Sequence, residues 1–157
     1  KRTETVMYHK GQVSFPGGAC DAIDCSRVDT ALRESFEEIG LRPADVELLG
    51  ELDDMVTRTS NYIVSPFVGV IPYPYAFRIS REEIEELVEV PISVLLNRCN
   101  FREELRFEDG ESYTSLFYDC GQHVIWGATA RILRQFLELV FGAQSPGAQG
   151  EPTQALR

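Results

Sequence analysis

The sequence is poor in the residues that build zinc sites and disulfide frameworks. Its 157 residues include only two histidines and four cysteines, at positions 20, 25, 99 and 120, and no Cys-x-x-Cys pair occurs. Structural zinc sites use four such ligands at close spacing, and disulfide frameworks are typical of small secreted domains. We therefore expect neither, and we expect the four thiols to be unpaired in a reducing cytoplasm.

Long apolar runs and basic charge are also scarce. No apolar run approaches the roughly 20 residues that span a bilayer, and no secretory signal opens the sequence. The sequence has 15 Lys and Arg residues and 25 Asp and Glu residues, which gives a formal net charge of −10. Nucleic-acid backbones are bound by basic faces, so we expect no nucleic-acid partner and no membrane partner. A phosphorylated small molecule stays allowed if a divalent cation lies between it and the acidic protein.

Strand and helix patterns alternate along the chain. Helices are predicted from about Ser26 to Ile39, with Gly40 as the C-terminal cap, over Pro91–Leu96, and as an amphipathic segment over 128–142. Strands are predicted at Gln12–Phe15 and within 46–58, 61–72, 113–120 and 123–127. This order favours a mixed sheet with helices on its faces.

The domain boundaries follow from composition. We expect one domain over residues 1–142, with an earlier strand preceding the charged first residues. The segment 143–157 is polar and rich in proline and glycine, so we expect it to be a disordered tail.

The helix predicted at 26–39 has an unusual distribution of charge. Its apolar side consists of Val28, Ala31, Leu32, Phe36 and Ile39. A different side carries the carboxylates of Glu34, Glu37 and Glu38, and we expect Arg33 to project away from them. Carboxylates at this spacing repel each other by a few tenths of a kcal/mol per pair. They also lie near the negative end of the helix dipole.

A hard divalent cation would reverse both costs. Mg²⁺ or Mn²⁺ prefers carboxylate oxygens and also binds phosphate oxygens. Such an ion polarises a phosphoryl group and lowers the pKa of a bound water. The alternative is a solvated acidic helix face, which is common for runs of charge.

The segment "GGACDAIDCSRVDTALRESFEEIGL", Gly17 to Leu41, resembles the Nudix box, Gly-x5-Glu-x7-Arg-Glu-U-x-Glu-Glu-x-Gly-U, in which U is apolar. Its second half, from Arg33 to Leu41, matches except at Ser35. In the first half Asp24 replaces the glutamate, and eight residues separate it from Arg33. The resemblance implies the Nudix fold, an α+β protein built as an α/β/α sandwich. It also implies that Asp24 or Asp21 braces the loop through a bond to Arg33.

The longer loop, with "HKGQVSFPGG" before it and "IWGATARIL" near the end, resembles the coenzyme A pyrophosphatase branch of this family. The similarity extends from Arg2 to about Phe141, although Met7 stands where the branch often has arginine. The implied reaction is hydrolysis of coenzyme A or an acyl derivative to 3′,5′-ADP and 4′-phosphopantetheine. The alternatives are a Nudix hydrolase for ADP-ribose or another nucleoside diphosphate derivative, and a nucleotide-sensing module without activity.

The resemblance also assigns residues to the site. It implies a Mg²⁺ or Mn²⁺ site formed by Glu34, Glu37, Glu38 and the backbone carbonyl of Gly17, in which a metal-activated water attacks the pyrophosphate. Glu34 is the first candidate for the base, and the candidates from a later loop are Glu83, Glu85 and Glu86. The predicted catalytic residues are thus Glu34, Glu37 and Glu86. Glu83, Glu85 and Glu86, the late glutamates, fit equally well as charged surface residues that keep an exposed edge soluble.

A 3′-phosphate needs cationic partners. The candidates for this role are Arg2, Lys10 and Arg58, with ordinary surface charge as the alternative for each. The predicted partner is therefore a small-molecule pyrophosphate, and the predicted location is the cytoplasm. The sequence leaves the oligomeric state open, with a homodimer as one option.

Overall fold

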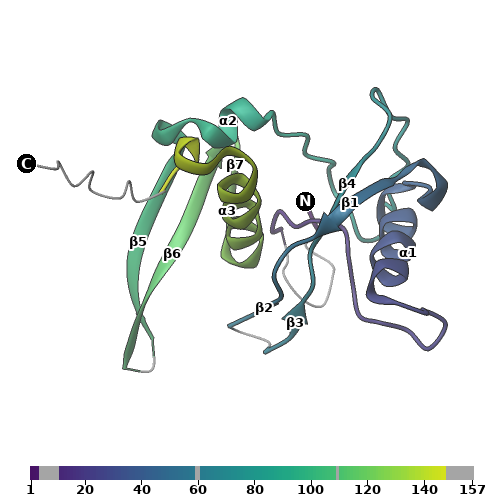
Figure 1. Ribbon diagram of the computed structural model, residues 1–157, viewed down its shortest axis with the longest axis horizontal. Coiled ribbons are helices and arrows are strands. Elements are labelled where there is room, and N and C mark those ends of the chain that lie inside the picture. Colours follow the sequence, from purple (N-terminus) through teal and green to yellow (C-terminus); the bar gives the residue numbers. More distant parts are fainter. Residues whose placement is uncertain (4–10, 59–60, 109, 148–157) are drawn as a thin grey trace, which may run out of the picture. The chain divides into compact units, whose positions relative to one another are not determined.

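The computed structural model describes residues 1–3, 11–58, 61–108 and 110–147 (Figure 1). The chain divides into two compact units, Lys1–Glu89 and Val90–Arg157. Each unit contains both helix and strand, which confirms the predicted α+β class. The described strands form three small antiparallel sheets rather than one mixed sheet.

The longest element of the first unit is the helix α1, Arg27–Ile39. Its first turn is capped by Ser26, whose hydroxyl oxygen accepts from the backbone N–H of Asp29 at 3.2 Å. Its last turn ends at Gly40, which has a φ of 69° and donates its N–H to the carbonyl of Phe36 at 2.9 Å. The predicted helix and its glycine cap are therefore confirmed.

The described residues of this unit also form two short antiparallel sheets (Figure 1). Strand β1, Glu47–Glu51, follows the 3-10 turn Pro43–Asp45 and pairs with β4, Phe67–Val70. Strand β2, Met55–Val56, pairs with β3, Ile63–Val64. These strands fall within the two predicted segments, 46–58 and 61–72.

Three chain segments that are distant in sequence meet at the C-terminal end of α1. The backbone N–H groups of Arg78 and Ser80 donate to the carbonyls of Ile39 and Glu38 at 2.9 and 2.8 Å. A little further along, Ile84 forms an isolated antiparallel bridge with Arg2. The N–H of Arg2 in turn donates to the carbonyl of Gln12 at 3.0 Å. This end of α1 is therefore surrounded by backbone whose position is fixed by hydrogen bonds.

The predicted strand at Gln12–Phe15 is wrong, because these residues form a loop. A strand requires a continuous ladder of backbone hydrogen bonds with a neighbour. Here the neighbouring residue Arg2 makes its bridge with Ile84, and Pro16 ends the segment without an N–H to donate.

The second unit is an antiparallel meander covered by a helix. Its strands are β5, Phe101–Glu108, β6, Glu111–Cys120, and β7, His123–Trp126. The short helix α2, Ile92–Leu96, precedes the 3-10 turn Arg98–Asn100 and β5, whereas α3, Gly127–Phe141, packs on β6 and β7 (Figure 1). The core residues of this unit are Leu95, Leu116, Phe117, Tyr118, Ile125, Ala130, Leu133 and Leu137.

The packed part of the second unit continues past the predicted boundary at residue 142. After the 3-10 turn Gly142–Gln144, the side chains of Ser145 and Pro146 are fully buried. The carbonyl of Gly147 accepts from Nη2 of Arg134 at 3.3 Å. Ser145, Pro146 and Gly147 thus contribute packed groups to the second unit, whereas residues 148–157 lie outside the described residues, so the tail stays a prediction.

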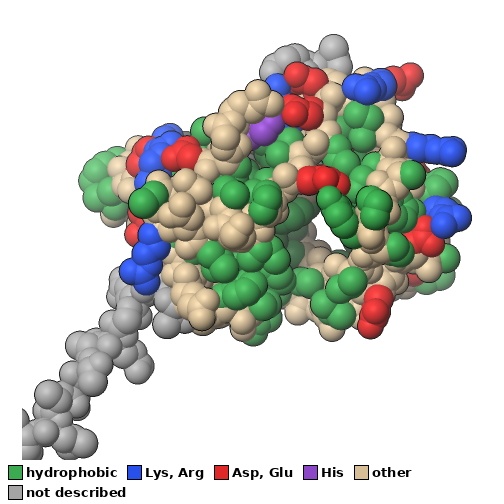
Figure 2. All heavy atoms as spheres, turned by 90° about the horizontal axis from the view of Figure 1, so that it is seen from above, with side chains coloured by type: hydrophobic (Ala, Val, Ile, Leu, Met, Phe, Trp, Pro, Cys, Tyr) green, Lys and Arg blue, Asp and Glu red, His purple; other side chains and the backbone are tan. Residues whose placement is uncertain are grey.

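Much of the acidic charge on the surface is locally paired. Figure 2 shows Asp and Glu side chains next to Lys and Arg side chains at several places on one face. Arg42 with Asp45 and Arg134 with Glu138 are examples, each with a closest N–O distance of 2.7 Å. In the described part of the chain, no helix is both long and apolar enough to span a membrane.

Candidate functional site

Arg33 on α1 anchors the loop that precedes the helix. Its Nε donates to Oδ1 of Asp24 at 3.0 Å, and its Nη2 donates to Oδ2 of Asp24 and to the carbonyl of Ala19, both at 3.1 Å. Of the two residues expected to brace the loop, Asp24 and Asp21, it is Asp24 that bonds to Arg33. Asp21 supports it from the backbone, because its N–H donates to Oδ2 of Asp24 at 2.8 Å.

This ion pair fixes the charge state of both partners. The Arg33 guanidinium holds the pKa of Asp24 well below its usual range, with further help from the Asp21 N–H and the Thr30 hydroxyl. Asp24 likewise raises the pKa of Arg33 above its ordinary value, followed by Glu34. The pair therefore stays charged throughout the neutral range and holds the loop against the side of α1.

Arg33 also binds two of the three helix carboxylates. Its Nη1 lies 2.9 Å from Oε1 of Glu34 and 3.1 Å from Oε2 of Glu37. The expectation that Arg33 projects away from the glutamates is wrong. A guanidinium carries five N–H donors on a long side chain, so it can serve Asp24 and both glutamates at once. This attraction offsets the repulsion between the carboxylates.

The glycine pair approaches the same carboxylates through its backbone. A β-carbon on Gly18 would lie 2.4 Å from Oε1 of Glu34, a distance that β-carbons essentially never show. The N–H of Gly17 donates to Oε2 of Glu38 at 3.3 Å, and Gly17 has a φ of 154°. The main chain of the glycine pair and the two carboxylates are therefore close together, and a β-carbon at Gly18 would displace the Glu34 carboxylate.

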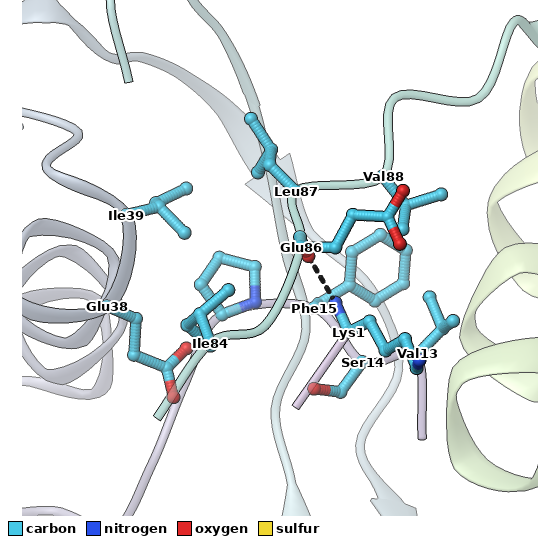
Figure 3. A pocket seen from close by; sticks show the side chains of 11 residues that line it. Lys1, Val13, Ser14, Phe15, Glu38, Ile39, Ile84, Glu86, Leu87 and Val88 are labelled. Atoms are coloured by element: carbon cyan, nitrogen blue, oxygen red, sulfur yellow. Dashed lines mark hydrogen bonds between the residues drawn. The ribbon is translucent and has the colours of Figure 1, made fainter. Parts of the chain in front are cut away.

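Glu38 is the most buried of the three glutamates. Its residue is 3% exposed, and Oε1 lies 3.2 Å from Nη1 of Arg2. It borders a cavity of about 110 Å³ whose walls include Phe15, Ile39 and Ile84 (Figure 3). Burial raises the pKa of Glu38, whereas Arg2 and the Gly17 N–H oppose the shift. Sequence periodicity placed Glu38 on the polar side of the helix and did not predict this burial.

The predicted apolar side of α1 is correspondingly wrong at one position. Phe36 is 53% exposed, whereas Thr30, Ser35 and Glu38 are buried together with Ile39. The segments that cover the helix approach it on the Glu38 side, as the bonds from Ser80 and Gly17 show.

The late glutamates lie near this site. Glu86 borders the same cavity as Glu38, and Figure 3 shows its carboxylate pointing away from Glu38 and towards Val88. Glu83 has an oxygen 3.8 Å from Nη2 of Arg2, and Glu85 pairs with Lys1 at 3.0 Å.

The three predicted phosphate-binding cations have different surroundings. Arg2 is bonded to Glu38 and is only 22% exposed in its side chain. Arg58 is exposed at a turn just after β2. Lys10 lies outside the described residues. Sequence reasoning missed the contact between Arg2 and Glu38, because the residues are 36 positions apart and no periodicity links them.

The carboxylates have the right chemistry for a hard divalent cation, although they do not converge as they stand. Within the ranges that the structure describes, no three His, Cys, Asp or Glu side chains gather closely enough to hold an ion. Glu34 and Glu37 turn towards Arg33, and Glu38 turns towards Arg2. Each carboxylate is thus paired with a guanidinium, which provides the positive charge that a metal ion would bring. Carboxylate oxygens are the ligands that Mg²⁺ and Mn²⁺ prefer. The residues therefore fit such an ion once these side chains turn from the arginines.

Comparison with known proteins assigns the family. A model of the NUDIX domain matches residues 1–95. The chain belongs to the Nudix family. It is 35% identical, over 89% of its length and 74% of the other protein, to an uncharacterized Nudix hydrolase NudL of Photorhabdus laumondii. A NudL of Escherichia coli K12 is 36% identical over 86% of this chain and 70% of its own. The predicted family and enzyme class, a Nudix pyrophosphatase, are thereby confirmed.

Proposed function

We propose that this Nudix protein is a Mg²⁺- or Mn²⁺-dependent hydrolase of coenzyme A or acyl-coenzyme A. Glu34, Glu37 and Glu38 would hold the ion, and the Gly17 carbonyl would complete the site. The observation that carries the metal assignment is that all three carboxylates lie within two turns of one helix and each binds a guanidinium. When bound, the ion would neutralise the pyrophosphate and lower the pKa of the attacking water.

The protein residues around it would orient the reactants and move the proton. Asp24 holds Arg33, and Arg33 holds Glu34 and Glu37, so the carboxylates are prepared in one region before substrate binds. Glu34 is our candidate for the base that takes a proton from the attacking water. Glu86 is the alternative, and it would have to turn its carboxylate back towards Glu38 to reach the same region (Figure 3).

The substrate assignment is supported by the sequence of the loop and by its resemblance to the coenzyme A pyrophosphatase branch. The products would be 3′,5′-ADP and 4′-phosphopantetheine. Arg2, Arg58 and Lys10 are the proposed partners of the 3′-phosphate. ADP-ribose or another nucleoside diphosphate derivative is the alternative substrate class. A cytoplasmic location and a homodimer stay predictions from the sequence.

A panel of pyrophosphates tests both parts of this proposal. Coenzyme A, an acyl-coenzyme A and ADP-ribose are each assayed with Mg²⁺ and with Mn²⁺. We expect the highest kcat/KM on a coenzyme A substrate, and faster turnover of ADP-ribose would replace that assignment. A protein that binds these nucleotides without cleaving any of them would instead be a sensing module.

A matched pair of variants separates metal chemistry from folding. Glu37→Gln removes one carboxylate whose side chain is 55% exposed, so we expect the protein to fold and to lose several orders of magnitude in kcat. Glu47→Gln removes the same charge from an exposed residue of β1 and should retain full activity.

A further inference from the structure

Arg2 is held beside Glu38 by its own backbone. Its N–H donates to the carbonyl of Gln12 at 3.0 Å, and the next residue, Thr3, donates to the carbonyl of Glu83 at 2.8 Å. Arg2 also forms an isolated antiparallel bridge with Ile84, the residue that follows Glu83. The guanidinium therefore reaches Glu38 from an ordered segment, and the contact is not a chance pairing of two mobile surface chains.

The buried surroundings of Glu38 require a nearby positive charge, and without a bound metal ion the Arg2 guanidinium provides it. Its side chain is 4% exposed and borders a cavity lined largely by apolar residues. A carboxylate in such a place is strongly disfavoured unless a positive charge and hydrogen bonds compensate it. Arg2 provides the charge at 3.2 Å, and the Gly17 N–H provides one hydrogen bond at 3.3 Å.

The guanidinium groups of Arg2 and Arg33 differ in how many partners they would keep without their glutamates. Arg33 keeps Asp24 and the Ala19 carbonyl as partners even without its glutamates. Among the described residues, the other acidic neighbour of Arg2 is Glu83, whose oxygen lies 3.8 Å from Nη2, too far for a hydrogen bond. The buried Nε of Arg2 has no hydrogen-bond partner among the described residues. Arg2 is therefore the cation that can most easily leave its glutamate.

We propose that Arg2 competes with the divalent cation for Glu38. The guanidinium occupies the carboxylate in the metal-free protein, and metal binding at Glu38 displaces it. This inference rests on the proposed function, because it assumes that Glu38 is a metal ligand. The contrary possibility is that Arg2 is a positioning residue that orients Glu38 for the metal, and the two roles predict opposite effects of removing it.

The test measures Mn²⁺ binding directly, by calorimetric titration of the metal-free protein at pH 8. Competition predicts that Arg2→Gln binds Mn²⁺ more tightly than the wild type, by roughly fivefold or more. Arg2→Lys keeps the charge but cannot match the forked geometry of a guanidinium, so its affinity should lie between the two. Unchanged or weaker binding in both variants would overturn the proposal.

Two controls make the result specific. Arg42→Gln removes an equal charge from a surface pair with Asp45, so it reports the effect of net charge alone and should leave Mn²⁺ affinity unchanged. An equal gain in Arg42→Gln would also overturn the proposal. Glu38→Gln should weaken Mn²⁺ binding in the wild-type background. If Glu38→Gln binds Mn²⁺ as tightly as the wild type, the assignment of Glu38 as a metal ligand fails. If Glu38→Gln binds Mn²⁺ more weakly but Arg2→Gln binds it no more tightly than the wild type, only the proposed competition is refuted.

Metal-free stability provides a second readout. Removal of Arg2 leaves the buried Glu38 carboxylate without its cation, so Arg2→Gln should have a lower Tm than the wild type in EDTA. The same variant should show the larger rise in Tm when Mn²⁺ is added, because the ion then supplies the missing charge. Equal rises in both proteins would contradict competition.

Discussion

A β-carbon on Gly18 would lie 2.4 Å from Oε1 of Glu34, so the backbone of the loop lies directly against this carboxylate. The atom that would have to move is the end of a flexible side chain, and Gly18 does not have a positive φ. We therefore expect Gly18→Ala to fold normally but to push the Glu34 carboxylate away. A displacement of about 1 Å in a catalytic group can cost about a hundredfold in rate, and kcat should fall by this order.

Gly50→Ala is the matched control for this prediction. Gly50 lies in β1, and a β-carbon there meets no atom within 4 Å. Both variants are compared by steady-state kinetics and by thermal melting. A loss of rate in Gly18→Ala that accompanies an equal loss of Tm would point to unfolding and against displacement of Glu34.

Asp24 should make the stability of the protein depend on pH in the acidic range. Arg33 lowers the pKa of Asp24 in the folded state, so the folded protein releases this proton more readily than the unfolded chain. The stabilisation is therefore complete when the pH is well above the pKa of Asp24 in the unfolded chain, about 3.9. It is lost as the pH falls towards the lower pKa of Asp24 in the folded protein. Asp24→Asn should have a lower Tm than the wild type at pH 7, and the difference should shrink below about pH 4.

Thermal melts of both proteins between pH 7 and pH 3 measure this effect. Glu47→Gln is again a suitable control, since it removes one exposed carboxylate. A difference in Tm between wild type and Asp24→Asn that stays constant with pH would show that the bond acts through packing and not through charge.

Local features of the site could be predicted from the sequence. The bounds of α1 follow from Ser26, Gly40 and the residues between them, because capping depends on a few neighbouring backbone groups. The resemblance to the Nudix box implied a bond from Arg33 to Asp24 or Asp21, and the structure shows it at Asp24.

The burial of α1 could not be predicted in the same way. Which side of a helix is buried depends on segments that arrive from elsewhere, here Arg2, Gly17 and Ser80 around Glu38. The strand β5 was missed for a related reason. Its charged residues interrupt the apolar pattern, and its pairing along the whole of Phe101–Glu108 is provided by β6.

Truncation after Gly142 should destabilise the protein. It removes the buried Ser145 and Pro146 and the carbonyl of Gly147 that accepts from Arg134. The burial of one of these side chains, together with the hydrogen bond to Arg134, contributes about 2 kcal/mol to the free energy of unfolding. For a chain of this size the Tm should fall by roughly 5 °C.

Truncation after Gly147 is the control, because it keeps every one of these contacts. We expect its Tm to stay close to that of the full chain. Differential scanning calorimetry of the three proteins decides the matter: equal Tm values for the full chain and the Gly142 truncation would mean that residues 143–147 add nothing to the stability of the second unit.

Removal of divalent cations should abolish activity and leave the protein folded. Arg33 and Arg2 compensate the three glutamates in the absence of metal, so no carboxylate of the set is left without a cation. EDTA should therefore stop pyrophosphate hydrolysis without changing the far-ultraviolet circular dichroism spectrum, and Mg²⁺ or Mn²⁺ should restore the rate. An ion present at about 100 times its Kd adds about 2.7 kcal/mol of stability, which should appear as a reversible rise in Tm. Hydrolysis that survives thorough chelation would exclude the metal-dependent mechanism, and loss of the fold in EDTA would show that the arginines do not substitute for the ion.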